Sequence, residues 1–138
     1  MKKISSYLII ILSIALGIFF IYKGINKNLL YDYSIPKIIE EGSSKPIEYQ
    51  NLMKVLYDSK FMIIIGVLEV LAGLLLIIPK TRLLGSIILM PVILNIFLLH
   101  LIIDNRPHEL VETGIPLLVN VIIFMYYYPK WKDLLWVK

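Results

Sequence analysis

Long apolar segments constrain the fold of this chain more than any other feature. A helix that crosses a membrane needs about 20 predominantly apolar residues, because each residue adds about 1.5 Å along its axis. Four segments approach this length, and none alternates polar and apolar residues as a transmembrane β-strand does. The sequence therefore predicts an all-α, membrane-embedded four-helix bundle, with spans at approximately residues 5–23, 60–78, 83–103 and 110–128.

The composition agrees with a membrane protein. Of the 138 residues, 59% are hydrophobic and 17% are charged, whereas a soluble domain averages about 45–50% and about 25%. We expect one transmembrane domain over residues 1–138, since four spans leave little chain for a soluble domain. The net charge is +4, and the charged residues lie mainly between the apolar segments. This placement favours contact with the lipid bilayer, and we expect no nucleic-acid partner. The absence of cysteine excludes thiolate catalysis and dithiol–quinone exchange.

The basic residues predict an orientation. The 14 lysines and arginines divide evenly between the two sides of the membrane. Their distance from the ends of the spans therefore decides which side is cytoplasmic. Lys80 and Arg82 lie in the four-residue link that joins spans two and three as an antiparallel hairpin, and such short segments weigh most in the positive-inside rule. We therefore expect this link and both termini in the cytoplasm. The first apolar run could instead be a signal peptide, but it continues apolar past Gly17, which favours a span.

The loop between the first two spans contains a shorter helical pattern. Between Pro46 and Asp58, apolar side chains recur at helical spacing while charged ones face elsewhere. This predicts a short extracytoplasmic amphipathic helix that lies on the outer membrane interface and leads into span two. An ordinary loop helix that covers the mouth of the bundle is the alternative, and both place it over the outer end.

Polar side chains inside the spans are the candidate functional residues. A charged group at the centre of a membrane helix costs about 2.5–3.5 kcal/mol of insertion free energy. Glu69 in the middle of span two is therefore a candidate for a functional or structural role. Gly66 and Gly73 share its helix face, and small residues allow close helix packing, which points Glu69 inward. The sequence predicts a polar pocket in the outer half of the bundle. Its primary candidates are Glu69, Asn95 and His100, and its secondary candidates are Asn120 and Asp104.

Two interpretations of this pocket remain open. In the first, Glu69 exchanges a proton, while Asn95 and His100 donate hydrogen bonds to a quinone headgroup. In the second, Glu69, Asn95 and Asn120 bond one another and fix the register of the helices. No phosphate loop, nucleophile elbow or metal-binding cluster is visible, and no catalytic residue is assigned.

Spans two and three resemble the DoxX family of small bacterial membrane proteins. The likeness rests on the pattern GxxExxxGLLL at Gly66–Leu76, the Pro79–Arg82 link, and the pattern PxxxNxxxxH at Pro91–His100. It implies a four-helix fold in the bacterial cytoplasmic (inner) membrane and association with quinone-linked oxidoreductases. The motif positions it marks are again Glu69, Asn95 and His100.

The sequence suggests three competing functions. The first is a subunit or partner of a quinone-linked oxidoreductase system, which contacts other membrane or redox subunits. The second is a non-catalytic membrane scaffold or assembly component of an envelope complex. The third, a small transporter or channel, is disfavoured because the chain has no visible inverted repeat or charge-lined path.

Overall fold

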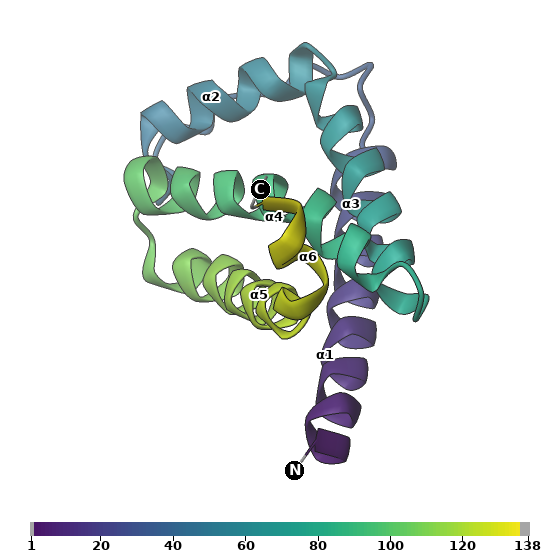
Figure 1. The fold of residues 1–138 in the computed structure, drawn as a ribbon. Helices are drawn as coiled ribbons and strands as arrows, with labels where there is room; N and C mark the ends of the chain where they lie inside the picture. The colour runs from purple at the N-terminus through teal and green to yellow at the C-terminus, as the bar shows by residue number, and fades with distance from the viewer. Residues whose placement is uncertain (1, 136–138) are drawn as a thin grey trace.

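The structure is a computed structural model that describes residues 2–135, and all regular elements within this range are helical. Four long helices pack together: α1 (Lys2–Lys23), α3 (Phe61–Ile77), α4 (Arg82–Leu99) and α5 (Pro107–Tyr126) (Figure 1). Two of them continue into π-helical turns, α1 into η1 (Gly24–Leu29) and α4 into η2 (His100–Asp104). Two short helices complete the chain, α2 (Ile47–Asp58) and α6 (Tyr128–Leu135). The predicted all-α helical bundle is confirmed.

The long helices suit a bilayer in length and in surface. Ser5–Leu29, Arg82–Asp104 and Pro107–Tyr126 are each long and apolar enough to cross a membrane, and the bent pair α2 and α3 provides a fourth candidate. The 17 residues of α3 alone reach about 25 Å. Large apolar side chains such as Ile11, Ile64 and Leu118 are exposed on the outside of the bundle. A lipid-facing surface requires this arrangement, because hydrocarbon offers no partner for polar groups.

Glycine allows α1 and α3 to meet backbone to backbone. A Cβ atom on Gly17 would lie 2.6 Å from the carbonyl oxygen of Gly73, and a Cβ on Gly73 would lie 2.6 Å from that of Gly17. The second contact along the pair joins Gly24 to Gly66, where an added Cβ on Gly24 would lie 2.8 Å from the Gly66 oxygen. Because no residue with a Cβ atom fits at these distances, the glycines set the spacing of the two helices.

A compact hairpin connects α3 to α4. Gly85 sits so close to α3 that an added Cβ would lie 2.8 Å from the carbonyl oxygen of Ala72. The side chain of Arg82 folds back, and its Nε donates to the carbonyl oxygen of Leu76 at 3.2 Å. The last carbonyls of a helix lack intrahelical partners, and a cation next to them also complements the helix dipole. Arg82 therefore closes the end of α3 as well as beginning α4.

The apolar core lies where the four long helices meet. Ile123 brings α5 into this cluster, and Leu76 and Leu89 are fully buried between α3 and α4. Dense packing of this kind fixes the relative positions of the polar residues on the same helices. The buried members of the cluster are Leu16, Phe20, Ala72, Leu76, Leu89, Ile93 and Ile123.

The helix α2 crosses one end of the bundle, at the top of Figure 1. It meets α3 at an angle of 83°, and Lys60 between them adopts a left-handed conformation with φ of 62°. We call this side, which carries η1, α2 and η2, the α2 end. The opposite side, which carries the start of α1, the Arg82 turn and α6, is called the terminal end.

We predict that Gly73→Val destabilises the bundle by about 1–3 kcal/mol, because overpacking a tight contact forces the backbones apart. Denaturant unfolding of the purified protein in detergent measures the change in the free energy of unfolding. The matched control is Leu74→Ala on the same helix, since Leu74 is exposed outside the bundle. Equal stability of the two variants would contradict a backbone contact between α1 and α3.

Candidate functional site

A cavity of about 920 Å³ opens beneath α2, between the α2-end halves of the long helices. This volume lies in the range of small-molecule sites, about 300–1,000 Å³, which combine apolar walls with a few polar groups. Apolar side chains from α1, α2, α3 and α4 form most of the wall. The three primary candidates from the sequence, Glu69, Asn95 and His100, all line this one cavity.

The carboxyl group of Glu69 is buried at the junction of α3 and η1. Its side chain is 4% exposed, and Asn28 donates a hydrogen bond from Nδ2 to its Oε2 at 2.7 Å. Asn28 belongs to the π-helical turn η1, and such wider turns often present side chains at functional sites. An added Cβ on Gly66 would lie 2.7 Å from the Cβ of Asn28. The glycine therefore makes room for the residue that binds Glu69.

Asn95 faces the cavity from α4. Its Nδ2 donates to the carbonyl oxygen of Pro91 on the same helix at 2.7 Å. The residue is exposed, and it lines the cavity. Because this hydrogen bond stays within α4, the side chain does not hold two helices together. Its remaining donor and acceptor positions are accessible to a bound molecule.

His100 belongs to a charged cluster at the mouth of the cavity. Its Nδ1–H donates to Asp104 Oδ2 at 2.7 Å, which directs Nε2 toward Glu109 Oε2 at 3.9 Å. Arg106 donates to both oxygens of the same carboxylate, from Nε at 2.6 Å and from Nη2 at 2.8 Å. This bidentate pair satisfies the buried charge of Asp104 and raises the pKa of the Arg106 guanidinium. Asp104 thus orients His100 without lining the cavity itself.

Tyr49 connects α2 to this cluster. Its ring lies 5.4 Å from the imidazole of His100, and the guanidinium of Arg106 lies 5.8 Å from its ring centroid. Burial raises the pKa of the Tyr49 phenol to about 12, so the hydroxyl keeps its proton at neutral pH. The contacts place the apolar face of α2 over the cavity.

A second charged group closes the α1 side of the mouth. Lys23, at the end of α1, forms an ion pair and hydrogen bond with Glu112 of α5. Lys27 of η1 approaches the same carboxylate at 3.8 Å. All three side chains line the cavity. The mouth therefore carries cations and anions in pairs around an apolar interior.

Asn120, a secondary candidate, lies away from the cavity. It donates from Nδ2 to the carbonyl oxygen of Ser86 at 3.2 Å, which links α5 to α4. Its Oδ1 is buried with no hydrogen-bond partner among the side chains that the structure describes. Glu69, Asn95 and Asn120 consequently have three different partners and do not bond one another. The interpretation in which these three residues form a mutual network is wrong.

Sequence reasoning missed Asn28, the direct partner of Glu69. The predicted first span ended at residue 23, whereas the helical segment continues through η1 to Leu29. The signal that could have found Asn28 is the apolar pair Leu29 and Leu30 directly after it. A polar residue just before an apolar pair indicates that the helix has not yet left the bundle.

Comparison with known proteins places the chain in a family. Residues 5–109 match the family described as Methylamine utilisation protein MauE. The DoxX resemblance is correct at the level of the DoxX-like clan, and the family within it is MauE. A 54-residue segment is 41% identical to a Bacillus subtilis (strain 168) protein described as Uncharacterized protein YwoB. That match covers 39% of this chain and 35% of YwoB, so the chain spans about a third of that relative. No solved structure matches the chain.

We predict that Asn28→Leu lowers the free energy of unfolding by about 1–3 kcal/mol, because the buried Glu69 carboxyl loses its hydrogen-bond donor. The double variant Asn28→Leu/Glu69→Leu should lose less than the sum of the two single variants, as a double-mutant cycle in detergent would show. Asn26→Leu is the matched control, since Asn26 lies in the same π-turn with an exposed side chain. Additive losses would contradict a direct bond between Asn28 and Glu69.

Proposed function

This chain belongs to the methylamine utilisation protein MauE family, and we propose that it is a membrane subunit or partner of a quinone-linked oxidoreductase system. The observation that carries the proposal is the cavity lined by Glu69, Asn95 and His100. The family name adds a chemical rationale. Methylamine contains reduced carbon, whose oxidation releases electrons that a membrane quinone can accept.

The residues of the cavity fit a quinone in shape and in polarity. The apolar wall suits the ring and the beginning of an isoprenoid tail, and Asn95 can donate from Nδ2 to one ring carbonyl. Because Nδ1–H of His100 donates to Asp104, its Nε2 donates to the other carbonyl only when the imidazole carries both protons, and otherwise accepts from a quinol hydroxyl. Glu69 lies deeper, where a carboxyl group can take up or release the proton that accompanies electron transfer. A bound quinone would supply the redox chemistry, and the electrons would come from a partner subunit. The role of this chain is to bind the headgroup and to handle protons.

A non-catalytic scaffold is the competing function. The bond between Asn28 and Glu69 joins η1 to α3 whether or not a ligand is bound, so it also serves a purely structural role. The two functions differ in what the cavity contains. A scaffold needs no occupant, whereas a quinone-linked subunit needs one that can be extracted.

We predict that protein purified in mild detergent carries a quinone near one equivalent, identified by solvent extraction and mass spectrometry. Asn95→Leu should lower this content roughly tenfold, because a hydrogen bond to the headgroup contributes on the order of 1.4 kcal/mol. The matched control is Leu94→Ala, whose exposed side chain does not line the cavity. No quinone in the wild-type protein, with a protein partner retained, would favour the scaffold.

Glu69→Gln separates binding from proton exchange. The glutamine oxygen can still accept the hydrogen bond from Asn28, but the side chain cannot exchange a proton at neutral pH. We expect this variant to fold and keep its quinone, while the host loses quinone-linked respiration. Respiration that survives both Glu69→Gln and Glu69→Ala in folded protein would exclude the proton relay. If both variants unfold, Glu69 is a structural clamp.

We also propose that both termini lie in the cytoplasm and the α2 end faces outward from the cytoplasmic (inner) membrane. The native chain has no cysteine, so single cysteines report their side cleanly. Ser44→Cys, in the exposed loop before α2, should react with a membrane-impermeant maleimide in intact spheroplasts. Lys80→Cys, in the α3–α4 turn, should react only after permeabilisation. The reverse labelling pattern would invert the topology.

A further inference from the structure

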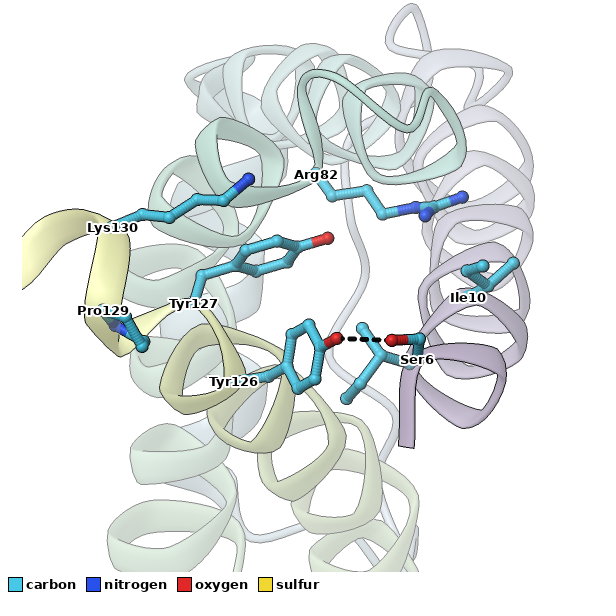
Figure 2. Close-up of a pocket in the computed structure, with 8 residues that line it drawn as sticks. Ser6, Ile10, Arg82, Tyr126, Tyr127, Pro129 and Lys130 are labelled. Atoms are coloured by element: carbon cyan, nitrogen blue, oxygen red, sulfur yellow. Dashed lines mark hydrogen bonds between the residues drawn. The ribbon is translucent and has the colours of Figure 1, made fainter. Parts of the chain in front are cut away.

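A second pocket, of about 360 Å³, lies at the terminal end of the bundle, away from the cavity under α2 (Figure 2). It forms where the start of α1 and the start of α4 face the corner between α5 and α6. None of the lining residues that the structure describes is acidic. They are Ser6, Ile9, Ile10, Arg82, Tyr126, Tyr127, Pro129 and Lys130.

Two cations line this pocket from opposite sides. The buried guanidinium of Arg82 uses Nε and Nη2 to bond the carbonyl oxygens of Leu76 and Ile77, at 3.2 and 3.5 Å, which leaves Nη1 for a ligand. Lys130 projects from α6, with its ammonium 5.2 Å from the ring centroid of Tyr127. Neither Arg82 nor Lys130 forms an ion pair with a carboxylate among the side chains that the structure describes.

The aromatic residues hold the pocket in shape. Trp131 donates from Nε1 to the carbonyl oxygen of Phe124 at 3.0 Å, and the two rings stack with centroids 4.5 Å apart. These contacts fold α6 back against α5 and place Lys130 at the pocket. Tyr126 is hydrogen-bonded to Ser6 at 2.9 Å, which joins α5 to α1. The hydroxyl of Tyr127 points across the pocket toward the Arg82 side (Figure 2).

We propose that this pocket binds the phosphate headgroup of an anionic phospholipid. Arginine and lysine are the common phosphate partners in proteins, and a tyrosine hydroxyl adds a neutral donor. A lipid is favoured over free phosphate because the pocket lies at the ends of the spans, where headgroups lie, and has Ile9 and Ile10 in its wall. The neighbouring side chains Tyr7 and Ile11 are exposed on the α1 surface and provide an apolar path for an acyl chain.

The proposed lipid would connect three parts of the bundle. Its phosphate would bridge Arg82 at the start of α4 and Lys130 on α6, and the pocket wall also includes α1. A ligand that binds only the folded protein stabilises it by mass action. Anionic lipid should therefore raise the thermal stability of the protein, independently of any ligand in the cavity at the α2 end.

Native mass spectrometry and thermal unfolding in a neutral detergent test the proposal, with phosphatidylglycerol, phosphatidylcholine and inorganic phosphate added separately. We expect phosphatidylglycerol to bind most tightly and to raise the unfolding temperature. Lys130→Ala should weaken its binding about five-fold, since one basic residue next to anionic lipid contributes on the order of 1 kcal/mol. Lys130→Arg should restore it. Lys132→Ala is the matched control, because Lys132 lies on the same helix outside the pocket.

Three results would overturn the proposal. Equal binding of phosphatidylglycerol and phosphatidylcholine would show that the lipid charge is not recognised. An equal shift with inorganic phosphate would show a free-phosphate site instead of a lipid site. Equal weakening by Lys130→Ala and Lys132→Ala would show only general attraction to charge. Among the described side chains Lys130 contacts the ring of Tyr127, which makes a small contribution to stability, so the Lys130→Ala variant should fold like the wild type.

Discussion

The contact between the glycine faces of α1 and α3 is the constraint on which the rest of the structure depends. The carbonyl oxygens of Gly17 and Gly73 occupy space that any side chain on the opposite glycine would need. In lipid, where burial of apolar surface does not drive helix association, such close packing and a few polar bonds hold helices together. The same glycine contact lets η1 pack against Gly66, which places Asn28 within hydrogen-bond distance of Glu69. The costly carboxyl group is thus tolerated because the glycines around it let its partner approach.

The cavity follows from a second constraint, the sharp break between α2 and α3. Because the two helices meet at 83°, α2 lies across the end of the bundle instead of extending α3. Its apolar face then covers space that the α2-end halves of the long helices leave unfilled, and Tyr49 attaches it to His100 and Arg106. The left-handed conformation of Lys60 stores some backbone strain at this corner. The cover of the site therefore depends on the two residues, Ser59 and Lys60, that connect α2 to α3.

The sequence predicts the helices well because their apolar runs are long, and it predicts which polar residues converge. Glu69, Asn95 and His100 line one cavity, with Glu69 deep inside it and His100 at its mouth. The partners of these residues could not be predicted in the same way. Asn28 lies in a π-helical turn, where the register of an α-helical wheel no longer applies. Arg82 reads as a cytoplasmic surface charge, yet it is buried against the carbonyl end of α3, because helix ends need donors that a hydropathy pattern does not show.

The charged residues at the two ends of the bundle have different partners, which indicates different roles for the two ends. At the α2 end, Lys23 pairs with Glu112 and Arg106 pairs with Asp104, so the charges around the cavity largely satisfy one another. Because paired charges leave little net charge to attract an ion, this end suits a neutral, amphiphilic molecule in an apolar interior. At the terminal end, Arg82 and Lys130 both line a pocket that has no acid among its described lining residues. Two cations that line one pocket favour an anion between them. The membrane surface is the nearest source of such an anion. The charges at the α2 end are therefore satisfied by ion pairs within the protein, and those at the terminal end by a lipid of the bilayer.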